Sequence, residues 1–187
     1  MRPSVFIAIV TAGLFCEVWG SAEETIVHQY PHDKEALVFV LDHEGGLTPP
    51  RLTNTPFLRI YGDGRVIVTH AFAPEVISVE GHLTRAELDE LVRWAVIDQR
   101  FFWFDEAAVR KAIDEADKAS GRSMVIADAE ATVITLTAEL NTVTHRWYAL
   151  GAYTVYYPQI KMLTRLWEIE QRLHRIADQV KRQRGMR

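Results

Sequence analysis

The chain has 187 residues, with 21 Lys and Arg against 25 Asp and Glu and a formal net charge of −4. This balance excludes the strongly basic composition that bulk nucleic-acid binding requires, so we expect no nucleic-acid partner. Apolar residues make up 48% of the chain, enough for one hydrophobic core, and the single cysteine excludes an internal disulfide.

The first 22 residues are typical of a cleaved secretory signal peptide. Arg2 precedes an apolar stretch, residues 5–15, whose length of about eleven residues suits a signal h-region, whereas a membrane-spanning helix needs about 20. Gly20 and Ala22 place small side chains at the −3 and −1 positions of a cut before Glu23. We therefore expect a secreted or periplasmic protein with no transmembrane segment after signal removal.

Two other interpretations of the N-terminus compete with this one. The apolar stretch would also suit a buried N-terminal helix. A helix packed on the domain is expected to be amphipathic, but no polar face interrupts this stretch. Cys16 lies at the depth where a lipoprotein signal carries its lipidated cysteine, but the bulky Phe15 stands where such signals have a small residue. Cleavage after Ala22 would leave residues 23–187 as a single, cysteine-free domain.

The first half of this domain predicts β-structure. The apolar run 37–41, which ends before a pair of glycines, is typical of a strand. Residues 57–61 and 65–69 flank Gly62-Asp63-Gly64, and Asp-Gly supplies the positive φ angles of a tight turn. The β-branched and aromatic residues on both sides suit a pleated surface, so this segment predicts a β-hairpin.

Two helices are expected next. Thr84 and Glu87 match the capping box, in which each side chain bonds the backbone amide of the other residue, and apolar residues follow at helical spacing. Asp105 predicts the cap of a second helix, which Gly121 ends.

The second half predicts another hairpin and a last helix. Residues 131–137 alternate Thr with apolar residues, Asn141 marks a turn, and residues 143–150 form the return strand. An aromatic loop follows, and Pro158 stands where a long helix, about residues 159–182, begins. The predicted fold class is α+β: an antiparallel sheet built from two β-hairpins plus an N-terminal strand, with two central helices and a long C-terminal helix.

Catalytic motifs are weak throughout the chain. No serine after the signal lies in a Gly-x-Ser-x-Gly elbow, and the glycines at 62 and 64 lack the third glycine and the following helix of a phosphate loop. Asp128 and Glu130 stand two residues apart at the start of a strand, so they project from one face, and His145 is the nearest base on the partner strand. These three residues define a hydrolase alternative, and a solvated strand end is the simpler explanation.

Potential metal ligands do not form a convincing pattern. His28 and His32 are four residues apart, but Pro31 lies between them and disfavours the helix that would bring them together. The triplet Asp42-His43-Glu44 stands at a strand end. Free surface histidines are the commoner outcome, so we expect no metal and no cofactor.

Aromatic residues crowd two short segments. Residues 101–104 are four aromatics in a row that include Trp103, and they cannot all face one core, so at least one should stay exposed. Tyr153, Tyr156 and Tyr157 crowd the second segment. Trp and Tyr suit sugar or peptide contacts, which makes these four residues candidates for binding, with ordinary packing as the alternative.

The last predicted helix carries a heptad seam, with apolar residues at spacings of 3, 4, 3 and 4: Leu166, Ile169, Leu173, Ile176 and Val180. Earlier apolar residues of this helix point elsewhere, so it is expected to serve two surfaces in succession. Its end is basic, because residues 160–187 carry eight basic and three acidic side chains. Leu173, Ile176 and Val180 are candidates for binding a protein partner or a second copy of the chain; the alternative is a helix docked on its own domain.

Four short motifs occur in an order that resembles a group of uncharacterised secreted bacterial proteins. They are the hairpin 61–66 (Tyr-Gly-Asp-Gly-Arg-Val), the helix start 83–88, the strand approach 127–129 and the strand end 148–151 (Tyr-Ala-Leu-Gly). The resemblance spans roughly residues 36–173. That group has no assigned activity, so the resemblance implies a secreted, single-domain protein and no site residue.

The leading hypothesis is a non-catalytic exported protein that binds a protein or envelope ligand. Catalytic motifs are missing, whereas aromatic clusters and a two-faced helix are present. The hydrolase alternative requires Asp128, Glu130 and His145 to converge in a pocket. The distances between these side chains in the fold therefore decide whether the geometry supports it.

Overall fold

The fold is seen in a computed structural model that describes residues 29–46, 53–70 and 75–185. Its strands are β1 (Leu37–Gly45), β2 (Leu58–Tyr61), β3 (Arg65–His70), β4 (Ile77–His82), β5 (Glu130–Ala138) and β6 (Asn141–Tyr148). Its helices are α1 (Arg85–Arg93), the π-helical turn η1 (Trp94–Asp98), the 3₁₀ turn η2 (Phe101–Trp103), α2 (Glu106–Ser120), α3 (Leu150–Tyr156) and α4 (Lys161–Gln183). None of the helices in these ranges is long and apolar enough to cross a membrane. The predicted signal peptide, residues 1–22, lies outside the described residues.

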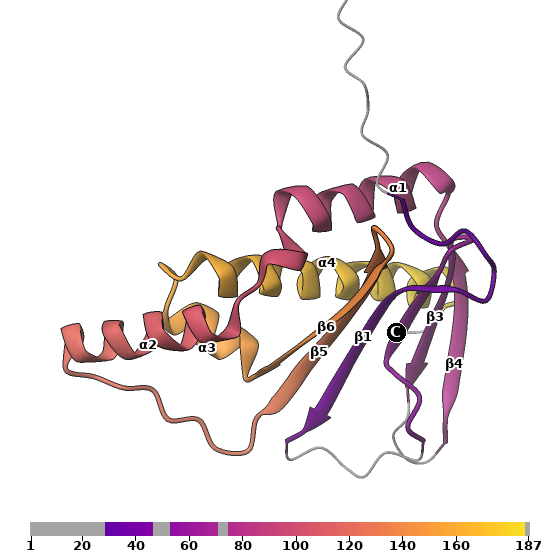
Figure 1. Cartoon of the computed structure of the whole chain (residues 1–187). Coiled ribbons are helices and arrows are strands. Elements are labelled where there is room, and N and C mark those ends of the chain that lie inside the picture. Colours follow the sequence, from indigo (N-terminus) through magenta and orange to yellow (C-terminus); the bar gives the residue numbers. More distant parts are fainter. Residues whose placement is uncertain (1–28, 47–52, 71–74, 186–187) are drawn as a thin grey trace, which may run out of the picture.

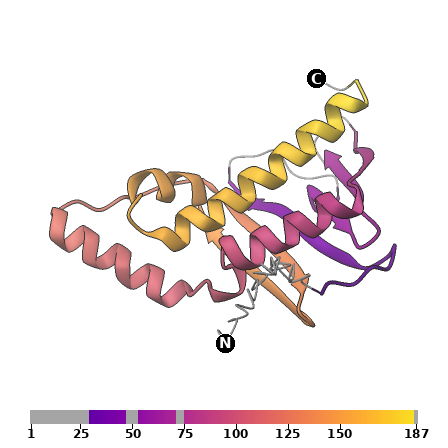
Figure 2. The same ribbon diagram turned by 90° about the horizontal axis from the view of Figure 1, so that it is seen from above.

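The six strands form one antiparallel sheet in the order β4-β3-β2-β1-β5-β6. Strands β1 to β4 follow one another as a meander, and the β5–β6 hairpin pairs with the other side of β1. Helices α1 and α4 lie over one face of the sheet, whereas α2 and α3 stand to one side (Figure 1). Seen from above, α4 runs across the sheet with α1 beside it (Figure 2). The predicted α+β class is confirmed.

One face of the sheet is apolar and forms the floor of the core. Leu41 pairs with Leu58 on one side and with Ile134 on the other, and all three side chains are fully buried. The opposite face carries polar side chains such as Thr135 and Thr144, whose hydroxyl oxygens are 2.8 Å apart. This alternation is expected of an antiparallel sheet with one solvated face.

The predicted β2–β3 hairpin is confirmed. Gly64 has a φ of 95°, which a tight turn requires, and its amide donates to the Tyr61 carbonyl at 2.9 Å. A Cβ atom on Gly62 would lie 2.1 Å from the Pro31 carbonyl oxygen, so only glycine fits at this close approach.

Both predicted helix starts are confirmed. The Thr84 amide donates to Glu87 Oε2 at 2.7 Å and the Glu87 amide donates to the Thr84 hydroxyl at 3.3 Å, which completes the capping box of α1. The Asp105 carboxylate accepts from the Ala108 amide at 3.0 Å, and Gly121, with a φ of 65°, ends α2.

The prediction from sequence missed two elements. The sheet has six strands rather than five, because residues 77–82 form β4 at the edge beside β3. Most of β4 is exposed and it contains Gly81, and both properties weaken a strand pattern. The segment predicted as an aromatic loop contains the helix α3, in which Leu150 and Thr154 are buried. Its aromatic and β-branched residues have low helix propensity, so burial stabilises α3.

Helix α4 packs against two parts of its own domain, as its two apolar stripes predict. It contacts α3 near Trp167 and the strands β3 and β4 towards its end. Four residues of the heptad seam are between 0 and 4% exposed: Leu166, Ile169, Leu173 and Val180. The seam therefore builds the core of this domain.

Gly81 of β4 allows the end of α4 to approach the sheet. A Cβ atom on Gly81 would lie 2.4 Å from a γ-carbon of Val180, whose side chain is 4% exposed. Beyond the last turn of α4, Arg184 Nε donates to the Glu80 carbonyl at 3.0 Å. The contact between β4 and α4 therefore requires a glycine at position 81.

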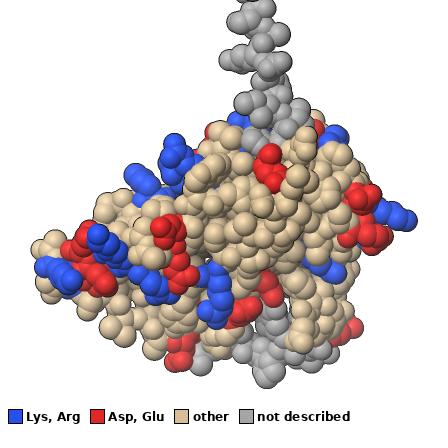
Figure 3. Space-filling model, viewed as in Figure 1, with Lys and Arg blue, Asp and Glu red and all other residues tan. Residues whose placement is uncertain are grey.

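Charges on α2 are mixed in sign. Arg110 pairs with Glu106 at 2.6 Å, and Lys111 pairs with Glu115 at 3.9 Å. Figure 3 shows basic and acidic side chains interspersed at this end of the molecule, next to a broad uncharged surface. The outer face of α2 is therefore a solvated surface of mixed charge.

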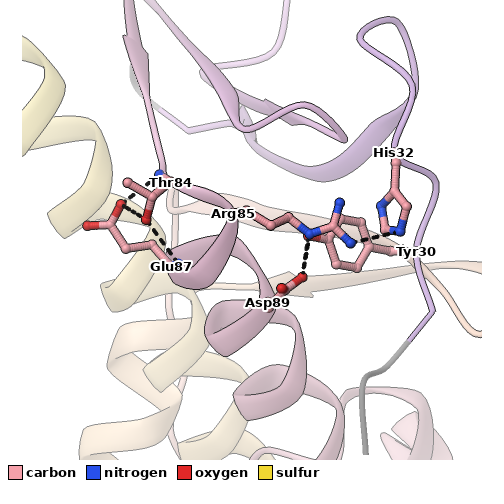
Figure 4. Close-up of polar contacts among 6 residues, drawn as sticks. All are labelled: Tyr30, His32, Thr84, Arg85, Glu87 and Asp89. Atoms are coloured by element: carbon pink, nitrogen blue, oxygen red, sulfur yellow. Dashed lines mark hydrogen bonds and ion pairs between the residues drawn. The ribbon is translucent and has the colours of Figure 1, made fainter.

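The Tyr30 side chain connects the segment before β1 to α1 (Figure 4). The Tyr30 hydroxyl donates to Asp89 Oδ1 at 2.6 Å, and Arg85 Nε donates to the same oxygen at 2.9 Å. The Arg85 guanidinium also lies over the Tyr30 ring, 4.9 Å from its centre. Burial and the hydrogen bond to Asp89 raise the pKa of Tyr30, so the hydroxyl stays a donor at neutral pH.

Gly81→Ala is expected to destabilise the domain, because the new methyl group overlaps the branched side chain of Val180. The free energy of unfolding, measured by urea titration, should fall by about 1–3 kcal/mol. In the double variant Gly81→Ala/Val180→Ala the two losses should be less than additive, because the overlap is removed. Glu80→Ala changes an exposed neighbour and should stay within about 0.5 kcal/mol of wild type. Additive losses in the double variant would contradict the overlap.

Candidate functional site

The three residues of the hydrolase alternative do not converge. Asp128, with a φ of 58°, precedes β5, Glu130 begins it, and both side chains are exposed. His145 on β6 pairs with Ile134, which lies four residues along β5 from Glu130, a rise of about 13 Å. The imidazole Nε2 instead lies 2.8 Å from the Phe101 carbonyl oxygen and donates to it. This separation takes the carboxylates out of hydrogen-bond reach of the imidazole.

The three predicted binding tyrosines differ in exposure. Tyr156 is 43% exposed, Tyr153 is half-buried and Tyr157 is buried. The Tyr157 hydroxyl donates to Asp117 Oδ1 at 2.6 Å, which ties α3 to α2. Burial, together with this hydrogen bond, raises the pKa of Tyr157 to about 12. Tyr157 therefore serves packing, and Tyr156 presents the largest surface of the three.

The predicted partner-binding residues on α4 lie mainly inside the domain. Leu173 and Val180 are buried in the core and offer no surface to a partner. Ile176 is half-buried and lines a groove between α1 and α4 together with Arg172. Arg172 is paired there with Glu90 at 2.8 Å. The seam thus lacks the continuous exposed surface that a coiled-coil partner needs.

Trp103 is the most exposed of the predicted binding residues. Its side chain is 63% exposed, whereas Phe101 is 1% exposed and Phe102 and Phe104 are half-buried. The prediction that at least one of the four consecutive aromatics stays exposed is confirmed. The four consecutive aromatics therefore supply both a side chain buried in the core, Phe101, and an exposed ring, Trp103.

Two backbone irregularities direct Trp103 outwards. The Gln99 amide donates to the Trp94 carbonyl at 3.0 Å, which widens the turn after α1 to π-helical geometry. Arg100 then adopts the left-handed conformation, with a φ of 54° and a ψ of 44°. This conformation costs about 1–3 kcal/mol for a residue with a Cβ atom. The turn η2 begins directly after the reversal and carries Trp103.

A pocket of about 170 Å³ opens between this turn and the first half of α4. Its lining consists of Gln99, Arg100, Phe101, Trp103, Phe104, Met162, Arg165, Leu166 and Ile169. Most of these side chains are apolar, and the two arginines bring positive charge to them. Neither arginine forms an ion pair with an acidic residue in the described ranges. The pocket can therefore accept an apolar group with a negative charge beside it.

Sequence reasoning found Trp103 but missed Arg100, Met162 and Arg165. Residues 162, 165, 166 and 169 stand at helical spacing, so they share one face of α4. That spacing is visible in the sequence. The meeting of this face with residues 99–104, far earlier in the chain, depends on the tertiary fold.

The histidines considered as metal ligands lie in separate places. His32 Nε2 is 2.8 Å from the Arg85 guanidinium (Figure 4), and His28 lies outside the described residues. Of the triplet 42–44, Asp42 accepts from the Phe57 amide at 3.2 Å and Glu44 pairs with Arg146 at 2.9 Å. His43 projects from the other face of β1, towards α4.

Comparison with protein-family models, with curated proteins and with solved structures gives no match for this chain. The resemblance of the hairpin and strand-end motifs to a group of uncharacterised secreted proteins therefore stays a prediction.

The domain is expected to lose stability as the pH falls below about 6.5, the usual pKa of histidine. Burial lowers the pKa of His145 in the folded state, against the opposing effects of its bond to Phe101 and of Glu106. Between the lowered pKa and 6.5 the unfolded chain binds more protons, so the free energy of unfolding decreases as the pH falls. His145→Gln should flatten this decrease, measured by urea unfolding between about pH 7.5 and 5.5.

The matched control for this experiment is His82→Gln, at an exposed histidine on β4. It should leave the pH dependence of unfolding as in wild type. A slope that is the same in His145→Gln and in wild type would show that His145 does not contribute.

Proposed function

We propose that this chain is an exported, non-catalytic binding domain that recognises an acidic protein segment by holding one bulky apolar side chain in the pocket beside Trp103. The observation that carries the proposal is the combination in one pocket of an exposed tryptophan, an apolar lining and two arginines without a described acidic partner. Trp and Arg are the residue types enriched at the energetic centres of protein interfaces.

The size of the pocket favours a side chain over a whole small molecule. Sites for drug-sized ligands measure about 300–1,000 Å³, whereas this pocket measures about 170 Å³. A single aromatic or long aliphatic side chain suits a space of this size. A protein partner also supplies contacts around the rim, which a small cavity alone lacks.

Charge complementarity specifies the residues that flank the anchor. Arg100 is exposed and Arg165 is half-buried at the same pocket. Guanidinium groups bind carboxylates through paired hydrogen bonds, so a partner with Asp or Glu beside its apolar anchor engages both the pocket and the arginines. This attraction weakens as the salt concentration rises.

The support beneath the pocket is rigid. Phe101 is buried, its ring lies 4.5 Å from that of His145, and its carbonyl accepts the His145 hydrogen bond. Leu166 and Ile169 of α4 are 3% and 1% exposed. A site on such fixed elements loses little conformational entropy on binding, which favours affinity.

The domain, residues 23–187, is expected to select from a randomised displayed library peptides that carry a bulky apolar residue flanked by Asp or Glu. Trp103→Ala should raise the Kd of a selected peptide at least tenfold, because it removes an exposed aromatic hot spot. Arg165→Glu should raise the Kd more at low than at high salt. The Kd is measured by isothermal titration calorimetry at both salt concentrations.

Val155→Ala is the matched control, because Val155 is 77% exposed on α3 and does not line the pocket. Its Kd should equal that of wild type. Selected peptides without an acidic and apolar consensus would contradict the proposal, and so would a folded Trp103→Ala variant that binds as tightly as wild type.

Export and cleavage of the signal peptide are tested by a separate experiment. When the full chain is expressed in a bacterial host, the exported fraction should contain a species that begins at Glu23, as measured by intact mass. Ala22→Phe places a bulky residue at the −1 position and should block cleavage, so that the uncleaved chain accumulates. Arg2→Lys keeps the positive charge and should be processed as wild type. Recovery of the wild-type chain at full length in the cytoplasm would contradict export.

A further inference from the structure

Three potential metal ligands meet between β1 and α4. His43 projects from β1, and Glu170 and His174 lie one helical turn apart on α4. One ligand atom from each residue lies within 4.8 Å of the ligand atoms of the other two. Among the residues that the structure describes, no other three potential metal ligands lie so close together. His43 Nδ1 is 3.9 Å from Glu170 Oε1, and His174 Nε2 is 4.0 Å from the same oxygen.

The surroundings of this His43–Glu170–His174 cluster hold it in place. The two imidazoles are stacked with their centres 5.2 Å apart, and the Phe57 ring lies 5.2 Å from His174 and 5.9 Å from His43. Thr132, the β5 residue paired with His43, donates to Glu170 Oε1 at 2.8 Å. A hydrogen bond of this kind orients a metal-binding carboxylate. Oε1 is also the oxygen nearest the two imidazoles, and its second lone pair can bind the ion.

Glu170 is in an unfavourable position for a carboxylate without a cation. It is 7% exposed and follows Ile169, which belongs to the hydrophobic core. Within the described part of the chain, Thr132 is the sole hydrogen-bond donor to Glu170. Buried carboxylates are stable in proteins when they are paired or coordinate a metal. An ion held by all three residues would meet that requirement.

We propose that His43, Glu170 and His174 bind one divalent transition-metal ion of the class of Zn²⁺. Two imidazoles and a carboxylate are an established ligand set for zinc, with water in the fourth position. In a tetrahedral site with bonds of about 2.0–2.1 Å, neighbouring ligand atoms are about 3.3 Å apart. The pairs at 3.9 and 4.0 Å must therefore close by about 0.6–0.7 Å, and no pair by more than about 1.5 Å. The side chains of His43 and His174 are 15% and 34% exposed, which gives an ion and its water access.

The charges around the cluster favour a cation. Glu130 and Asp178 lie close enough to act electrostatically on Glu170 and His174, respectively. Lys181 opposes them at His174, but its ammonium group pairs with Asp178 at 3.6 Å. Among the residues that the structure describes, the remaining carboxylates therefore give the cluster a negative surplus.

The donor set also selects the class of ion. Imidazole nitrogen suits Zn²⁺ and its transition-metal neighbours Co²⁺, Ni²⁺ and Cu²⁺. Ca²⁺ and Mg²⁺ require more oxygen ligands than one carboxylate and one hydroxyl supply. Hard cations are therefore expected to bind far more weakly here.

The test uses the untagged domain, residues 23–187, after treatment with a chelator. Calorimetric titration with ZnCl₂ should show one site per chain, and Zn²⁺ should raise the midpoint of thermal unfolding. Co²⁺ should give the visible absorption of a tetrahedral site. Mg²⁺ at the same concentration should give neither effect.

Variants connect binding to the three residues. Glu170→Gln keeps the acceptor for Thr132 but removes the charge, and His174→Gln removes an imidazole, so each should weaken Zn²⁺ binding at least tenfold. Thr132→Val removes the outer hydrogen bond and should weaken binding by about tenfold. His145→Gln and His32→Gln change histidines outside the cluster and should bind Zn²⁺ as wild type.

Two results would overturn the proposal. One is a wild-type Kd for Zn²⁺ weaker than about 100 μM, the range of incidental surface binding. The other is an unchanged affinity in both Glu170→Gln and His174→Gln. Urea unfolding without metal shows which variants are folded, and only those are compared. The result is independent of peptide binding, because none of the three ligands lines the pocket beside Trp103.

Discussion

The burial of the apolar stripe of α4 against the sheet is the contact on which the rest of the domain depends. Leu173 and Ala177 are fully buried and Val180 is 4% exposed, and each large aliphatic side chain buried in this way contributes about 1.5–3 kcal/mol. The chain has a single cysteine, so packing without a disulfide holds the layers together. The same helix forms one wall of the pocket with its first half and supplies Glu170 and His174 from its middle.

The register of β1 connects the core to the polar cluster. Leu41 and His43 are two residues apart, so they project from the same face of the sheet. A register in which Leu41 is buried against Leu58 and Ile134 therefore also directs His43 to α4 and places Thr132 beside it. A slip by one residue would turn all of these side chains to the solvated face. The geometry of the cluster is thus fixed by the hydrophobic pairing next to it.

Local signals in the sequence were enough for the elements that are stabilised locally. The Gly62–Gly64 turn, the Thr84 capping box and the Asp105 cap are all where they were predicted, because their hydrogen bonds join residues within one turn. Strand β4 and helix α3 were missed because tertiary contacts stabilise them against weak local preference. Trp103 was found because four consecutive aromatics cannot share one core. The arginines beside it were not found, because their meeting with the pocket depends on how α4 docks.

The pocket beside Trp103 and the polar cluster both contain residues that stability alone would not favour. Arg100 occupies a left-handed conformation that glycine would adopt without strain. The cluster of His43, Glu170 and His174 places polar side chains where apolar residues of similar volume would be neutral or stabilising. Asp128, Glu139, Leu140 and Ala149 also have a positive φ, but they stand in the turns and bends that flank β5 and β6. Proteins tolerate such conflicts mainly at functional sites. At both places the unfavourable residues are of types that bind ligands: an arginine at the pocket, and two histidines and a glutamate in the cluster. Ordinary packing does not explain why these residue types stand there.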